Sequence, residues 1–224
     1  MPIWNLKELR DQIRTIKGDR KDLIELVDAI ADSIDVFRYH LVTARDSLKP
    51  YVQNEDATDP AHFEYLLGAA DKQDEFEWAK LTNRSNVIAA IYTTRSIYDI
   101  FSQLIRGCLL ESVVSIERCS IHIVRDQLPK GDLRDCLDGL LSSDGFKYVN
   151  DFANVSKHRS MISFGASINF VENRAGVRFK SFEYGNRKHP EMWSSDVLEL
   201  VLQTKNIIID AGNALNKATQ CANV

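Results

Sequence analysis

The sequence of 224 residues lacks the features that mark a membrane or secreted protein. It contains no stretch of about 18 uncharged apolar residues, so we expect no membrane-spanning helix. The first residues, Met1 to Lys7, do not resemble a signal peptide. Four cysteines, none in CxxC spacing, favour reduced thiols and a cytoplasmic location. Few glycines (10) and prolines (5), with 27% charged residues, indicate an ordinary globular chain.

The common catalytic motifs are missing as well. There is no GxxxxGK(S/T) or GxGxxG phosphate-binding loop, no GxSxG nucleophile elbow and no HExxH zinc motif. The five histidines stand at no metal-ligand spacing from one another or from a cysteine: His40, His62, His122, His158 and His189. We therefore expect no metal site and no cofactor, and the motifs leave open whether the protein is an enzyme.

Helical periodicity dominates most of the sequence. Apolar residues recur at steps of three and four, which predicts a bundle of six to eight helices. Pro50 and Pro129 mark two helix ends, because proline cannot continue the hydrogen-bond ladder. The expected helices cover residues 6–16, 19–48, 60–80, 83–108, 110–128, 133–141, 146–157 and 197–217.

The period changes to two near residue 162. From Ile162 to Phe170 apolar and polar residues alternate, which predicts a strand with one buried face. A turn over residues 172–176 and a second strand over 177–184 complete a hairpin. The predicted fold class is thus mainly α, a multi-helix bundle with one β-hairpin before the C-terminal helix. We expect a single domain over 1–224, with N-terminal helices over 1–50, a core bundle over 60–160, the hairpin over 161–185 and the last helix over 194–217.

The formal net charge of −4 is unevenly distributed. Between Gly145 and Pro190 there are eight Lys or Arg against three Asp or Glu, a net of +5, which leaves −9 for the remainder. The same segment is rich in Phe and Tyr, and cations beside aromatic rings suit a nucleic-acid or nucleotide surface. Alternatively, the aromatic rings pack the hairpin onto the helices and the cations only solvate its outer face.

A polar stripe crosses the otherwise apolar helix predicted over 83–108. Arg95, Asp99, Gln103 and Arg106 stand three or four residues apart and share one face. A buried charge is costly unless it is paired. The stripe is therefore either a surface Arg95–Asp99 pair or the polar inner wall of a site.

A second group of polar residues ends the helix predicted over 146–157. Asn154, Lys157 and His158 stand at i, i+3 and i+4 on one face, and Arg159 follows. Cations near a helix C-terminus are favoured by the helix dipole, so the group has a purely structural explanation. As a functional site, it offers an imidazole beside two cations, which suits a general base near a phosphodiester.

This combination of helices with a late Asn-x-x-Lys-His segment resembles the HEPN superfamily (higher eukaryotes and prokaryotes nucleotide-binding domain). The catalytic hallmark of that family is Arg followed by four to six residues and then His, commonly Arg-Asn-x-x-x-His. In this sequence Asn154 and His158 match, whereas Ala153 occupies the Arg position. No other histidine has an arginine at the required spacing, so the ribonuclease motif is not intact.

The resemblance implies a homodimer whose composite cleft contains Asn154, Lys157 and His158 from both copies, supported by Arg95, Asp99 and Gln103. Three hypotheses follow. The first is a non-catalytic site for RNA or a nucleotide at Asn154, Lys157 and Arg159. The second is a metal-independent endoribonuclease that uses His158 with Lys157 or Arg159. The third is an interaction module that binds a protein partner through the hairpin edge or an apolar patch.

Overall fold

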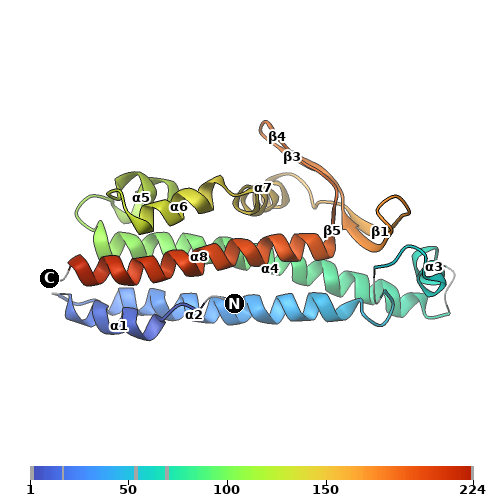
Figure 1. The fold of residues 1–224 in the computed structure, drawn as a ribbon, viewed down its shortest axis with the longest axis horizontal. Helices are drawn as coiled ribbons and strands as arrows, with labels where there is room; N and C mark the ends of the chain where they lie inside the picture. The colour runs from blue at the N-terminus through green and yellow to red at the C-terminus, as the bar shows by residue number, and fades with distance from the viewer. Residues whose placement is uncertain (1–2, 17, 53–54, 69–70, 223–224) are drawn as a thin grey trace. The chain divides into compact units, whose positions relative to one another are not determined.

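The chain is mainly helical, with small antiparallel sheets inserted before the last helix, as predicted (Figure 1). The computed structural model describes residues 3–16, 18–52, 55–68 and 71–222. Its helices are α1 (Leu6–Thr15), α2 (Lys21–Ser47), α3 (Pro60–Leu66), α4 (Gln73–Leu109), the 3₁₀ helix η1 (Ile116–Arg118), α5 (Ile121–Gln127), α6 (Asp132–Ser142), α7 (Asp144–His158) and α8 (Ser194–Ala222). Its strands are β1 (Phe164–Asn169), β2 (Arg174–Phe179), β3 (Phe182–Tyr184), β4 (Arg187–His189) and β5 (Met192–Trp193).

The chain divides into two compact units, each assembled from segments distant in sequence. The first, which we call the terminal unit, contains Met1–Val36, Thr93–Lys147 and Leu202–Val224. The second, the sheet unit, contains Phe37–Tyr92 and Tyr148–Val201. The single domain expected over residues 1–224 stays a prediction.

In the terminal unit, α1 begins and buries its apolar face as its sequence dictates. The side-chain oxygen of Asn5 accepts a hydrogen bond of 3.1 Å from the backbone N–H of Glu8, which satisfies one of the free donors at the helix start. Leu9 and Ile13, four residues apart, are fully buried. The three- and four-residue spacing of apolar residues thus predicts the buried face correctly.

Trp4, just before α1, joins the beginning of the terminal unit to α8. Its indole Nε1–H donates a hydrogen bond of 2.9 Å to Oδ1 of Asn216, 212 residues away in sequence. Its ring meets Phe101 edge to face at a centroid distance of 5.4 Å. Gly212 allows this arrangement, because a Cβ there would stand 2.3 Å from the Trp4 ring.

The helix predicted over residues 110–128 is wrong, because only α5 and the 3₁₀ helix η1 form there. Two side chains of α4 donate hydrogen bonds to backbone carbonyl groups of the segment between α4 and α5. Gln103 donates to Ile116 O at 3.4 Å, and Arg106 donates to Val114 O at 3.3 Å. Ser120 then caps α5 by accepting from Ile123 N at 3.4 Å. The loop backbone therefore finds partners without continuing the helix.

The helix predicted over residues 60–80 is also wrong. α3 ends at Leu66, and Gly68 follows with a φ of +77°, a left-handed conformation typical of a helix end. α4 begins at Gln73 and continues to Leu109. It therefore includes residues 73–80, predicted as the end of the preceding helix, together with the whole helix predicted over 83–108. Apolar periodicity places residues on a helix but does not show where one helix stops.

The hairpin expected over 161–185 is present as β1 and β2, but the strand predicted over 177–184 is split. β1 pairs antiparallel with β2, with Phe164 opposite Phe179, and β5 pairs with the other side of β2. β1 is therefore an edge strand. β2 ends at Phe179, and β3 pairs instead with β4 around Gly185 (φ +59°) and Asn186, a glycine-containing two-residue turn.

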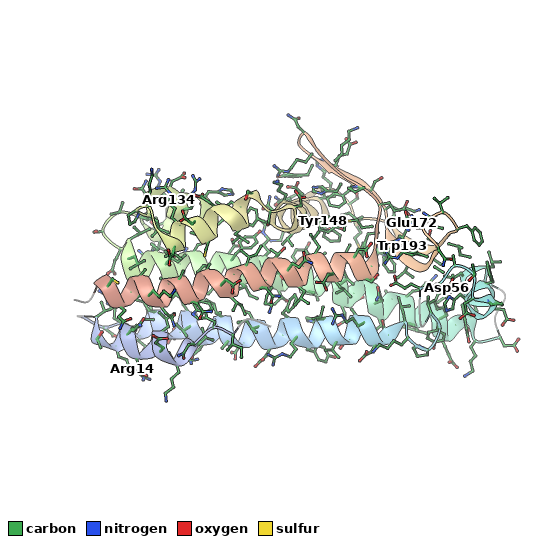
Figure 2. The ribbon with its side chains drawn as sticks, in the orientation of Figure 1. Arg14, Asp56, Arg134, Tyr148, Glu172 and Trp193 are labelled. Atoms are coloured by element: carbon green, nitrogen blue, oxygen red, sulfur yellow. The ribbon has the colours of Figure 1, made fainter. Side chains whose placement is uncertain are left out.

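A cluster around Trp193 attaches the sheet to its neighbours within the sheet unit. The Arg178 guanidinium lies 3.7 Å from the Trp193 ring centroid, and the Arg174 guanidinium lies 5.0 Å from it. The indole Nε1–H of Trp193 donates to Glu172 at 2.7 Å, and Arg178 donates to the same carboxylate at 2.6 Å (Figure 2). Such stacked and ion-paired arginines fix the orientation of β5 relative to β2.

No helix among the described residues has both the length and the apolarity needed to cross a bilayer.

Candidate functional site

The end of α7 presents three of the predicted site residues to solvent. Lys157, His158 and Arg159 are exposed, and Asn154 is half-buried one turn earlier. They are brought together because the last turn of α7 remains helical, with Arg159 N donating to Val155 O at 2.9 Å. The structure thus places the predicted face at the surface of the sheet unit.

Two tyrosine rings lie beneath the cations at this helix end. The Arg159 guanidinium lies 5.5 Å from the ring centroid of Tyr184 and donates to the carbonyl of Glu183 at 3.3 Å. The Lys157 ammonium lies 5.9 Å from the ring centroid of Tyr92. Both cations lie over aromatic rings, which favours ordered side chains. Neither has a carboxylate partner among the described residues.

Ion pairing removes most of the +5 surplus of the segment between Gly145 and Pro190. Six of its eight cations have a carboxylate within 4.0 Å, and the two without one are Lys157 and Arg159, counting partners among residues 3–16, 18–52, 55–68 and 71–222. Four of the partner acids lie outside the segment. The pairs are Lys147–Asp144, Arg174–Glu55 and Arg174–Asp196, Arg178–Glu172 and Arg178–Glu191, Lys180–Glu191, Arg187–Asp151 and Lys188–Glu183.

His158 has no orienting group in the part of the chain that the structure describes. No hydrogen bond or ion pair involves its ring there, and the side chain is exposed. Ala153, at the position that the HEPN motif reserves for arginine, is fully buried. A general base requires a fixed position, and a phosphate-binding arginine requires access to the phosphate.

A second polar constellation in the same unit was missed by the sequence analysis. Asp151 of α7 is fully buried and accepts two hydrogen bonds of 2.6 Å from the guanidinium of Arg187 on β4. Nε2 of His189 lies 2.8 Å from the same carboxylate. The His189 ring stacks on Phe182 at a centroid distance of 4.6 Å. This constellation fastens the β3–β4 hairpin to α7.

Two opposing effects act on the pKa of Asp151: its burial and its hydrogen bonds. Burial is the largest single effect and opposes ionisation, whereas the hydrogen bonds from Arg187 and His189 favour the charged form. Together the hydrogen bonds outweigh the effect of burial, so the pKa of Asp151 lies below its ordinary value of 3.8. Tyr148, labelled in Figure 2, packs edge to face against His189, and burial raises the pKa of its hydroxyl. The carboxylate is therefore a structural anchor that stays charged at neutral pH.

The predicted polar wall belongs to the terminal unit, whereas the end of α7 belongs to the sheet unit. On α4, Arg95 and Gln103 are half-buried and Asp99 is exposed. Gln103 and Arg106 donate hydrogen bonds to carbonyl groups of the loop after α4. A role for Arg95 and Asp99 in the site stays a prediction.

Among the described residues, no group of three or more His, Cys, Asp and Glu side chains is arranged to hold a metal ion. Comparison with known proteins adds no family: no protein-family model matches the chain, and no curated protein or solved structure shows significant similarity to it.

Proposed function

We propose that the end of α7 binds a phosphate group of RNA or of a nucleotide, without catalysing its cleavage. The observation that carries this proposal is that Lys157 and Arg159 are the two cations of their segment without a carboxylate partner among the described residues. Each lies over a tyrosine ring at the surface. Exposed cations with nearby rings suit phosphate and base contacts of a single strand.

The resemblance to the HEPN superfamily supports the same site. In that family two motif helices meet in a dimer, so the proposal includes a homodimer in which Asn154 and Lys157 of both copies line one cleft. The buried Ala153 and the exposed, unoriented His158 support the non-catalytic form of the proposal.

The proposal is tested by fluorescence anisotropy with a labelled single-stranded RNA over a series of salt concentrations. The test variant is Lys157→Gln with Arg159→Gln. The matched control is Lys180→Gln with Lys188→Gln, which removes two ion-paired cations of the same segment. For the test variant we expect weaker binding and a salt slope reduced by about 0.7 per cation removed. The control should keep the wild-type slope. Equal affinity and slope in all three proteins would reject the proposal.

The endoribonuclease is the alternative for the same residues, with His158 as base and Lys157 or Arg159 in place of the missing arginine. Purified protein incubated with total RNA, in parallel with His158→Ala, separates the two. Cleavage that depends on His158 and survives a chelator would establish the enzyme in place of the binding site.

The third hypothesis, a protein-binding surface, is favoured by one observation. β1 is an edge strand, and the turn after it exposes 67% of Phe170 and 98% of Val171. Edge strands offer unpaired backbone groups, and apolar side chains beside them add contact area. A pull-down that recovers one protein but no nucleic acid, and that Val171→Asp abolishes, would favour this function.

A further inference from the structure

A cavity of about 410 Å³ lies in the terminal unit, apart from the residues of the proposed phosphate site. Its wall is formed by the end of α4, the connection between α5 and α6, and the last turns of α8. Arg134 at the start of α6, labelled in Figure 2, is one of the lining residues. The volume falls within the range of about 300–1,000 Å³ typical of small-molecule sites.

The interior of this cavity is aliphatic. Leu110, Leu128, Leu133 and Ala214 are buried and line it. The described lining residues include no aromatic side chain and no Ser, Thr, Asn or Gln. The cavity therefore offers a flexible hydrocarbon chain a good environment, whereas it offers no ring for a nucleobase to stack on and no amide or hydroxyl to read it.

The charges at the cavity are mainly positive. Lys130 and Lys217 line it and are exposed, and neither has a carboxylate within 4.0 Å in the portion of the chain described above. Arg134 donates a hydrogen bond of 2.8 Å to Leu128 O, which holds the loop between α5 and α6. The positive charge of Arg134 therefore lies at the cavity lining. Asp132, in the first turn of α6, is the acidic lining residue. Three cations against one acid favour an anion at this mouth.

We propose that this cavity binds a medium-chain carboxylate, with the hydrocarbon chain among the leucines and the carboxylate at Lys130 and Lys217. Each methylene group removed from water strengthens binding about fourfold. An ammonium–carboxylate contact at the cavity mouth orients the chain and selects an anionic head group over a neutral one. The proposal is independent of the phosphate site, because it uses residues of the other unit.

Cys221 supplies a reporter for occupancy, because it lines the cavity and is exposed. The experiment measures the rate at which a maleimide modifies Cys221, followed by peptide mass spectrometry, with decanoate or decanol added below the micelle concentration. Decanoate should slow the modification, and decanol of equal chain length should require a higher concentration for the same effect. Protection by decanol equal to that by decanoate would overturn the proposal, as would no protection by either.

Two variants and one control make the assignment specific. Lys217→Gln should raise the decanoate concentration for half-protection about tenfold. Ala218→Phe fills the cavity and should abolish protection, provided that circular dichroism shows a folded protein. Lys147→Gln, which removes a half-buried lysine outside the lining, should behave as the wild type. Protection unchanged by both test variants would show non-specific association and would also overturn the proposal. RNA binding by the end of α7 is unaffected by any of these outcomes.

Discussion

The carboxylate of Asp151 is fully buried in α7, yet it is paired at 2.6 Å with Arg187, whose side chain is half exposed on β4. Asp151 places a negative charge in the core, and Arg187 neutralises that charge from the surface. The β3–β4 hairpin therefore has a specific task in the sheet unit, since Asp151 would be left as an uncompensated buried charge without it.

Asp151→Asn should lower the free energy of unfolding by about 2–3 kcal/mol. The asparagine side chain carries no charge and turns an N–H toward the donors of Arg187 or His189, so at least one hydrogen bond is lost. Urea denaturation measures the change. Glu183→Gln removes an exposed pair with Lys188 on the same hairpin and should change stability by less than about 0.5 kcal/mol. Equal effects of the two substitutions would contradict the buried anchor.

The same carboxylate predicts how stability depends on pH. Its pKa is lowered in the folded protein, so the unfolded chain binds more protons near the ordinary pKa of 3.8. The stabilisation is therefore complete above that value and is lost as the pH falls through the lower folded pKa. In denaturation curves between about pH 5 and pH 2, Asp151→Asn should show a shallower loss of stability than the wild type. Parallel curves for the two proteins would argue against the assignment.

Gly212→Ala tests the close packing of Trp4 on α8. Helix propensity alone predicts that this substitution stabilises the protein by about 1 kcal/mol. We expect the opposite, a loss of about 1–3 kcal/mol, because the new methyl group would lie 2.3 Å from the Trp4 ring.

Gly139→Ala on α6 is the matched control for that prediction. A Cβ at Gly139 meets nothing within 4 Å, so the propensity gain should appear undiminished. The two variants should therefore shift the midpoint of thermal unfolding in opposite directions. A stabilised Gly212→Ala variant would show that Trp4 moves aside without cost.

The four cysteines should react in a fixed order with a thiol reagent near neutral pH. Burial raises the pKa of the Cys108 thiol to about 12, and it also raises the pKa of Cys119 and Cys136. Cys221 is exposed and should react first, and Cys108 should react last, because its raised pKa leaves the smallest fraction of thiolate. Peptide mass spectrometry over time gives the order, and a slow phase that persists in Cys108→Ser would refute the assignment to Cys108.

Sequence periodicity predicted α1, α2, α6 and α7 to within two residues at each end. It failed where a helix stops for a local reason: Gly68 ends α3, and Gln103 and Arg106 hold a loop that the apolar pattern alone extends as helix. The turn at Gly185 and Asn186 carried part of a signal, because Gly-Asn is a typical two-residue hairpin turn, but the strand after it, Arg187 to His189, is polar.

The candidate site shows the limit of sequence reasoning more clearly. Its exposed face could be predicted from the i, i+3, i+4 spacing of Asn154, Lys157 and His158. The charge balance could not be predicted, because several partner acids lie outside the segment: Arg174 pairs with Glu55, 119 residues away, and with Asp196, 22 residues away. A sum of charges over one segment does not include acids from other segments. The broad basic surface predicted from that sum is therefore reduced to Lys157 and Arg159.

The hydrogen bond between Trp4 and Asn216 has a consequence for the order of folding during synthesis. A contact that spans 212 residues requires almost the whole chain to be present before it forms. The sheet unit, whose segments end at Val201, can be complete in sequence before Asn216 has been added. During synthesis, the docking of Trp4 on α8 is therefore among the last contacts of the terminal unit that can form.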